Sequence, residues 1–291
     1  MTMENDFFSV EVSSSGAELK KLYAKKWGRE LLWVPLDANA KNIWKRTSPI
    51  LFPIVGKLKN DIYTLKGKTY QMAQHGFARD REFTLLNSSP LEMDWFLEAD
   101  QKTFKHYPFC FELRVKYKLE GSKLVTLYAV KNVDRQDMFF SIGAHPGFST
   151  PEIDDCEIRF EKQEKEYFQL KDGLVDWGKS VAFESNEINP TKELFFKDAL
   201  IFKNLKSKYI DLVFKKQNEV IRVEGTNTPF CGIWAKDSVP FVCIEPWFGV
   251  SDSCDHDQNF ETKRGVQVLP MGESFEMQFS VELMSLKKIK G

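Results

Sequence analysis

The 291-residue chain lacks the short motifs of several large enzyme classes. It has no G-x-G-x-x-G and no G-x-x-x-x-G-K-[ST] segment, so neither a dinucleotide fold nor a phosphate-binding loop is expected. It has no G-x-S-x-G elbow of the α/β-hydrolases. No two histidines stand at the spacing of a helical metal site, so no zinc site is expected.

Charge imbalance, membrane spans and paired cysteines are also missing. The 41 basic and 42 acidic residues nearly cancel, so neither nucleic acid nor an anionic membrane is an expected partner. No apolar run approaches the roughly 18 residues of a membrane span, and the start MTMENDFF has no features of a signal peptide. The five cysteines form no C-x-x-C. A cytoplasmic protein with free thiols is expected, and Cys243 is interpreted as a small buried residue.

Helical signals are few. Asp37 is positioned to cap a short helix over 38–44, and residues 191–194 fit one helical turn. Strand patterns dominate instead. Residues 111–119 alternate strictly between apolar and polar, and a second β-rich run over 124–130 follows the turn Glu120-Gly121-Ser122, which predicts a hairpin.

Further strand patterns lie along the whole chain. A C-terminal run from Phe275 to Leu283 alternates, which predicts one buried and one wet face. Shorter β runs cover Phe8–Val12, Ala17–Tyr23, Arg29–Trp33, Met93–Glu98, Phe139–Gly143, Glu157–Phe160, Ile210–Phe214, Val220–Val223 and Phe241–Glu245. With no linker and no repeat, these runs predict one all-β domain over residues 1–291, a large antiparallel β-sandwich with few short helices.

Two titratable side chains end apolar runs immediately before a proline. They are His145 in SIGAHPGF and Glu245 in FVCIEPWFGV. A residue before proline is restricted to extended geometry, so both are predicted to lie at strand ends. On such a strand, Gly143 shares a face with His145 and leaves room above the sheet for a ligand. A histidine and a carboxylate held in this way can act as an acid–base pair.

Structural roles explain the same residues equally well at this stage. His145 can bond a backbone carbonyl in a turn, and Glu245 can accept backbone amides at a strand end. A carboxylate on an apolar face is costly to bury without a partner, which favours a functional role for Glu245. In QHGFARD, His75 and Arg79 are candidates for contacting a hydroxyl, or for an ordinary turn with a surface ion pair. Lys57 ends the apolar stretch PILFPIVGK as a possible hydroxyl or phosphate donor.

The segments PILFPIVGKL, QHGFARD, GAHPGF, FCGIWAK and CIEPWFGV, in this order, resemble the aldose 1-epimerase (galactose mutarotase-like) family, in particular its bacterial mutarotase-like branch. The resemblance runs from about residue 16 almost to the C-terminus. It implies a single large β-sandwich that interconverts the α and β anomers of a free hexose, with no cofactor and no metal. The expected partner is a small-molecule sugar, and the protein is expected to be a monomer or a homodimer.

The resemblance also implies residue roles. His145 falls on the family's general acid, Glu245 on its general base and His75 on a substrate contact. Asp198 matches the family's substrate-binding aspartate more loosely, and Trp234 offers an aromatic surface to the sugar. The acid–base roles require an ionised Glu245 and a protonated His145, and the neighbouring carboxylate is expected to raise the pKa of the histidine.

One departure from the family concerns the substrate. The family often has arginine where this chain has Lys57, and lysine lacks the two-pronged donor of a guanidinium. Two alternatives therefore stay open: a hexose-phosphate mutarotase, whose phosphate Lys57 and Arg79 would hold, and a carbohydrate-binding protein without catalysis. A glycoside hydrolase is disfavoured because it usually needs two carboxylates.

Overall fold

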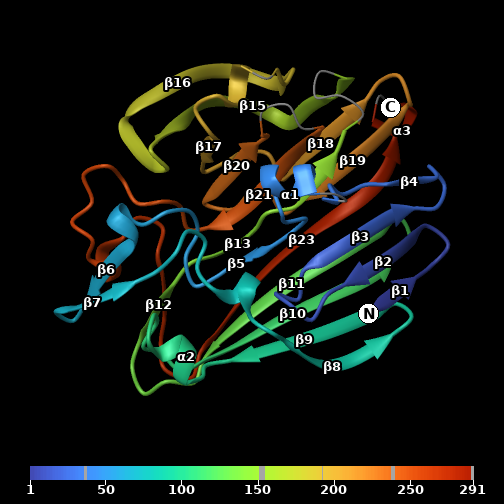
Figure 1. The fold of residues 1–291 in the computed structure, drawn as a ribbon. Coiled ribbons are helices and arrows are strands. Elements are labelled where there is room, and N and C mark those ends of the chain that lie inside the picture. Colours follow the sequence, from blue (N-terminus) through green and yellow to red (C-terminus); the bar gives the residue numbers. More distant parts are fainter. Residues whose placement is uncertain (36–37, 151–154, 192, 237–239, 290–291) are drawn as a thin grey trace.

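Antiparallel strands make up most of the computed structural model, which describes residues 1–35, 38–150, 155–191, 193–236 and 240–289 (Figure 1). One 15-stranded sheet dominates, in the order β5-β13-β21-β20-β17-β15-β18-β19-β23-β11-β10-β9-β8, with β14 on β21 and β16 on β15. Its strands are β5 (Ile50–Leu51), β8 (Thr84–Ser89), β9 (Glu92–Glu98), β10 (Phe111–Glu120), β11 (Lys123–Asn132), β13 (Ile142–Ala144), β14 (Gly147–Ser149), β15 (Glu157–Lys171), β16 (Leu174–Ile188), β17 (Leu200–Lys203), β18 (Tyr209–Phe214), β19 (Glu219–Glu224), β20 (Phe230–Trp234), β21 (Phe241–Phe248) and β23 (Ser274–Ser285).

Smaller elements complete the fold. A four-stranded sheet is formed by β1 (Thr2–Glu4), β2 (Phe8–Val12), β3 (Leu19–Ala24) and β4 (Arg29–Glu30), and two strand pairs by β6 (Ile62–Leu65) with β7 (Lys68–Gln71) and β12 (Met138–Phe140) with β22 (Gln267–Leu269). The helices are α1 (Ala38–Ile43), α2 (Gln101–Phe104) and α3 (Leu286–Ile289), with 3-10 turns η1 (Lys59–Asp61), η2 (Ala78–Asp80), η4 (Glu193–Phe195) and η5 (Phe260–Thr262). Among the described residues, no helix is long and apolar enough to cross a membrane.

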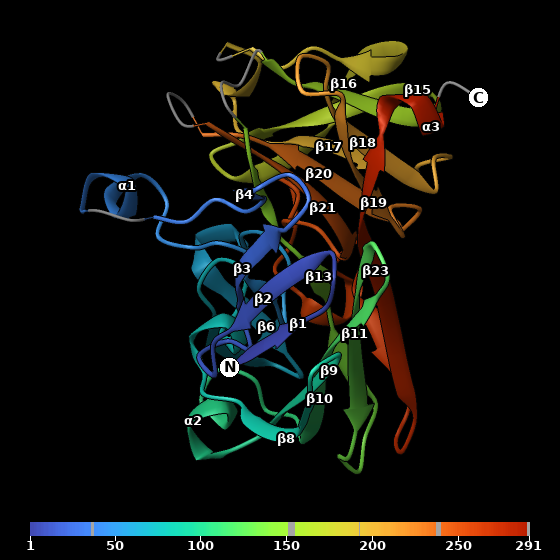
Figure 2. The ribbon, with the colours of Figure 1, turned by 90° about the vertical axis from the view of Figure 1, so that its right-hand side faces the viewer.

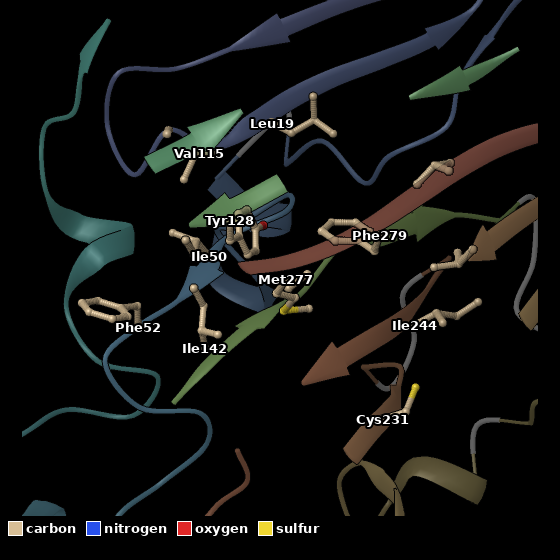
Figure 3. Packing of buried hydrophobic residues seen from close by; sticks show 14 of the residues in the cluster. Leu19, Ile50, Phe52, Val115, Tyr128, Ile142, Cys231, Ile244, Met277 and Phe279 are labelled. Atoms are coloured by element: carbon tan, nitrogen blue, oxygen red, sulfur yellow. The ribbon is translucent and has the colours of Figure 1, made fainter. Parts of the chain in front are cut away.

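The core lies between the two larger sheets, so the predicted all-β sandwich is confirmed. Figure 2 shows β1–β3 lying over the part of the large sheet that contains β9–β11. The hydroxyl of Tyr117 on β10 crosses this layer and donates to the carbonyl of Ala17, 2.8 Å away. One buried cluster contains side chains of both sheets, among them Leu19 of β3, Tyr128 of β11 and Phe279 of β23 (Figure 3).

The predicted hairpin is confirmed as β10 and β11. Its register pairs Phe111 with Asn132 and Leu119 with Leu124, and burial alternates along β10 as the sequence alternates. Because successive side chains of a strand point to opposite faces, the apolar set of β10 faces the core and the polar set faces solvent.

Two predicted strands differ from the structure. The run Arg29–Trp33 forms a strand only to Glu30, where the Glu30 carboxylate accepts the N–H of Leu22 on β3 at 2.7 Å and that of Leu32 at 3.1 Å in place of ladder bonds. The run Phe139–Gly143 is divided between β12 and β13. The break falls at Ser141, whose N–H donates to the carbonyl of Pro53 instead of to a neighbouring strand.

The longest strand pair escaped prediction. Only 157–160 of β15 was expected, whereas β15 and β16 run together over 157–188 with several register shifts. Much of this pair is exposed and polar, so it carries little apolar alternation. The helix predicted over 38–44 is α1, although Asp37, its expected cap, lies outside the described residues. The turn expected at 191–194 is η4, one to two residues later.

Candidate active site

A cavity of about 410 Å³ lies over strands β20 and β21 and is closed on one side by the segment that follows α1. Six of the seven site residues named from the sequence line it: His75, Arg79, His145, Asp198, Trp234 and Glu245. Segments separated by up to 170 positions in the chain thus meet around one space.

The strand register places His145 opposite Glu245. Strand β21 pairs with β14 through Gly147↔Cys243 and with β13 through Gly143↔Trp247. Both pairings belong to one continuous antiparallel register, which brings position 145 opposite position 245 in the gap between β13 and β14.

Proline has different effects at the two positions. Strand β13 ends at Ala144, so His145 follows a strand end as predicted. The same prediction is wrong for Glu245, because β21 continues through Pro246 to Phe248. The N–H of Trp247 points to the β20 side, where it donates to the hydroxyl of Thr228. Since N–H directions alternate along a strand, the nitrogen of Pro246 faces the gap between β13 and β14, where no ladder bond is required.

The acid–base pair is close and buried. His145 Nδ1 lies 3.3 Å from Glu245 Oε2, and the two side chains are 10% and 1% exposed. Neither atom has an aligned hydrogen bond among the described residues. Buried polar atoms normally have partners, so this pair retains hydrogen-bonding capacity for a ligand in the cavity.

Burial controls the protonation of this pair. Burial, and then the nearby Arg79 guanidinium, lowers the pKa of His145 to about 3. Burial, and then the Asp198 carboxylate, raises the pKa of Glu245 well above its usual range. The expected rise in the pKa of His145 is therefore wrong, because the free energy needed to bury a charged imidazolium exceeds the stabilisation that one neighbouring carboxylate provides. Both shifts favour a neutral pair in the ligand-free site, with an imidazole beside a protonated carboxyl group.

His75 is fixed in one tautomer. Its Nδ1 accepts the backbone N–H of Gly56 at 3.1 Å, so in the neutral ring the proton is on Nε2. Burial lowers its pKa well below the usual range, and His145 and Arg79 lower it further. The backbone at His75 has φ +65°, in the left-handed region that few side chains adopt. His75 is therefore a neutral N–H donor, held edge-on to His145 at 5.5 Å between ring centroids.

Arg79 is anchored beside this donor. One terminal nitrogen donates to the carbonyl of Gln74 at 2.6 Å, whereas its buried Nε makes no hydrogen bond among the described residues and lies 3.9 Å from the Asp80 carboxylate. Arg46, which no sequence pattern indicated, donates to the carbonyl of Arg79 at 3.0 Å and pairs with the carboxylate of Asp80. Burial, and then Arg46, lowers the pKa of Arg79. The sequence showed no arginine cluster because these two arginines are 33 positions apart.

Asp198 and Trp234 lie at the other side of the cavity. Asp198 is exposed to solvent on one side. Burial against the protein on its other side raises the pKa of its carboxyl group, while Lys236 and a hydrogen bond from Trp234 lower it. The Trp234 ring stands edge-on to His145, with 5.5 Å between ring centroids. Both predicted positions therefore belong to the same cavity as the acid–base pair.

Two tryptophans of the site were not predicted from the sequence. Trp44, just after α1, lies over His145 with 5.1 Å between ring centroids and contacts Trp234 at 5.7 Å. Trp247 fills the space above Gly143, where a Cβ would lie 2.4 Å from the indole. The prediction that Gly143 leaves room for a ligand is therefore wrong. The small residue Gly143 makes room for the indole of Trp247, and this glycine in the segment GAHP was the feature of the sequence that could have indicated it.

Lys57 lies outside the cavity. Its side chain packs against Gly173 in the turn between β15 and β16, and its amine contacts the carbonyl of Asp172 at 3.4 Å. It borders a separate polar groove with Asn60 and Gln71. The prediction that Lys57 binds the substrate is not supported by this position, since Ser251 and Gly56 line the cavity at the point that Lys57 was expected to occupy.

Comparisons with known proteins agree with this arrangement. The family model described as aldose 1-epimerase matches residues 1–281. The chain belongs to the aldose 1-epimerase family. Protein LacX of Lactococcus lactis subsp. lactis, in its chromosomal form, is 31% identical over 94% of this chain and 97% of its own length.

Solved structures resemble this aldose 1-epimerase family member over nearly its whole length. A galactose mutarotase related enzyme from Lactobacillus acidophilus has a TM-score of 0.93 at 35% identity, with 98% of this chain and 97% of that one covered. A galactose mutarotase-like protein from Lactobacillus casei has a TM-score of 0.91 at 29% identity, with 98% and 99% covered. The galactose mutarotase-like fold is therefore shown for this family member.

Proposed function

We propose that the protein is a mutarotase that interconverts the α and β anomers of a free hexose by acid–base ring opening. The observation that carries this proposal is the buried pair His145 and Glu245, 3.3 Å apart at the floor of the cavity with unused hydrogen-bonding capacity. A paired acid and base is what the reaction needs, because one proton must leave the C1 hydroxyl while another reaches the ring oxygen.

The neutral resting pair already contains the proton that the reaction uses. Transfer of this proton from Glu245 to His145, across 3.3 Å, produces a carboxylate and an imidazolium without exchange with solvent. Glu245 then accepts the proton of the C1 hydroxyl, His145 donates to the ring oxygen, and the C1–O5 bond breaks as C1=O forms. After rotation about C1–C2, the same transfers in reverse close the ring to the other anomer.

Neighbouring side chains support binding in this proposal. The Nε2–H of His75 and the guanidinium of Arg79 are donors for sugar hydroxyls or the ring oxygen. The rings of Trp44 and Trp234 provide the apolar surfaces on which sugars pack, and Asp198 is an acceptor at the cavity mouth. Positioned donors of this kind raise the rate by holding the ring in a reactive orientation.

A second candidate is mutarotation of a phosphorylated hexose. Four cationic side chains line the cavity, namely Lys45, Arg46, Arg79 and Lys236, and the buried Nε of Arg79 makes no hydrogen bond among the described residues. Arginine forks match the geometry of phosphate oxygens. This cationic lining supports a sugar phosphate, although through different residues from the Lys57 and Arg79 expected from the sequence.

Saturation-transfer NMR of the two anomers tests the proposal. Glucose, galactose and glucose 6-phosphate are measured in parallel with wild-type protein, and exchange above the spontaneous rate is expected for at least one of them. A preference for glucose 6-phosphate that falls steeply with salt supports the second candidate. Sugar-induced shifts in the protein spectrum without any exchange would contradict catalysis and identify a binding protein.

A further inference from the structure

A third metal-ligating atom lies beside the acid–base pair. Cys243 is two residues before Glu245 on β21, so the two side chains point to the same face, and His145 lies opposite in the register. The thiol, one imidazole nitrogen and one carboxylate oxygen all lie within 4.8 Å of one another. All three residues are buried. No sequence pattern indicated this set, because His145 lies 98 positions before Cys243 and reaches it only through the pairing of β13 and β14 with β21.

The spacing of these atoms fits a cation with tetrahedral coordination. Zinc bonds of about 2.0–2.1 Å at tetrahedral angles place a nitrogen and an oxygen ligand about 3.3 Å apart. The distance between His145 Nδ1 and Glu245 Oε2 is 3.3 Å. A sulfur ligand belongs about 3.5 Å from either atom, so a thiol that lies within 4.8 Å needs to move by no more than about 1.3 Å.

The hydrogen bonding of the cluster points the same way. His145 Nδ1 and Glu245 Oε2 are buried and have no aligned hydrogen-bond partner among the described residues, so both atoms keep the capacity to bind a ligand. His145 and Glu245 both line the cavity, so a cation has a path to them. The alternative role for Cys243 is an apolar filler, since it packs with Phe241 beneath Trp33, Trp44 and Trp234.

We propose that His145, Cys243 and Glu245 form a binding site for one thiophilic divalent cation of the Zn²⁺ type, which blocks the acid–base pair when bound. The ligands bind in deprotonated form, so the thiol proton and the proton of the pair pass to solvent and no electron is transferred. The inhibitory effect rests on the proposed mutarotase function, whereas binding itself does not. The site would make the enzyme sensitive to free zinc.

Cobalt spectroscopy tests the site without any assay of activity. Co²⁺ is titrated into protein in which Cys110 and Cys254, the two partly exposed thiols, are replaced by serine. A thiolate-to-cobalt charge-transfer band that saturates at one equivalent is expected, with visible bands of tetrahedral intensity. The band should be absent after Cys243→Ala and retained after Cys231→Ala, a matched control because Cys231 is equally buried on the neighbouring strand β20.

Zinc inhibition and sugar competition complete the test. Zn²⁺ should stop anomer exchange reversibly, with relief by a chelator, and Cys243→Ala should weaken this inhibition more than about tenfold while its metal-free exchange stays close to wild type. If Cys243→Ala does not fold, sugar added to the cobalt-loaded protein should bleach the band. No thiolate band in a protein that catalyses exchange would overturn the metal site alone. A band in a protein without exchange would leave the site standing and contradict the proposed function.

Discussion

The indole of Trp247 lies directly above Gly143, so that a Cβ at this glycine would be 2.4 Å from the ring. Gly232, on the opposite neighbouring strand, approaches the same ring equally closely. Both strands that flank β21, namely β13 and β20, therefore have a glycine next to the Trp247 indole. Trp247 is two residues after Glu245 on β21, so the two side chains lie on the same face of the sheet. Trp247 thus forms part of the wall that keeps the carboxyl group buried.

Gly143→Ala is expected to reduce both stability and exchange. The added methyl group must displace the Trp247 ring, and overpacking of this kind costs about 1–3 kcal/mol in the free energy of unfolding. Denaturant melts and anomer exchange measure the two effects. Gly178→Ala is the matched control, because a Cβ there meets only the Asp176 carboxylate at an ordinary 3.4 Å. Equal stability of the two variants would contradict the proposed role of the indole.

The pH dependence of exchange is expected to be bell-shaped. As the pH falls toward about 3, His145 takes up a proton, so that the pair holds two protons and can no longer act as a base. As pH rises through the raised pKa of Glu245, the pair loses its only proton and the acid function is lost. Profiles of kcat/KM in a chelating buffer measure both limbs. A rate that stays constant into alkaline solution, where the spontaneous reaction still permits measurement, would contradict the one-proton pair.

Lys263→Met is expected to destabilise the fold strongly. Lys263 and Asp252 form an ion pair at 2.9 Å in which both side chains are 1% exposed. Removing one partner of such a pair leaves an uncompensated buried charge and typically costs about 3–5 kcal/mol in the free energy of unfolding. Lys25→Met, which breaks the more exposed pair with Glu4, is the control and should cost about 1 kcal/mol or less. Similar denaturation midpoints for the two variants would argue against the buried pair.

Lys57→Ala is expected to leave exchange nearly unchanged. Lys57 lies outside the cavity, so its loss removes no contact to the sugar, and a substitution at such a position usually changes the free energy of unfolding by no more than about 0.5 kcal/mol. Arg79→Ala removes a charged donor from the cavity and should raise KM about tenfold or more. The comparison is made on the sugar that exchanges fastest. A large loss in Lys57→Ala would restore the sequence-based assignment.

Features that depend on residues close together in the chain were predictable from the sequence, and features that depend on distant residues were not. The β10–β11 hairpin was predictable because its partners are adjacent and its apolar alternation is complete. His145 and Glu245 were recognisable because each interrupts an apolar run before a proline. The direction of the pKa shift of His145 was not predictable, because burial acts through the whole fold and not through the one neighbouring carboxylate.

The missed residues share a physical reason. Trp44 and Arg46 follow a short helix in a segment without periodicity, and they reach the cavity only because distant strands bring His145 and Arg79 there. Lys57 was assigned to the site from its position at the end of an apolar stretch, but the neighbouring Gly56 is the residue that faces the cavity. Which of two adjacent residues faces a cavity depends on the backbone direction of a loop, which no pattern in the sequence specifies.

Glu245→Gln separates proton transfer from sugar binding in the proposed reaction. The amide keeps the shape of the side chain and its packing beside Trp247, but it cannot accept the proton of the C1 hydroxyl. Anomer exchange by saturation-transfer NMR and sugar binding by titration are measured on the same preparation. The account predicts that exchange falls by at least about 10²-fold while the affinity for the sugar changes little. Exchange at the wild-type rate in a folded, sugar-binding Glu245→Gln variant would contradict it.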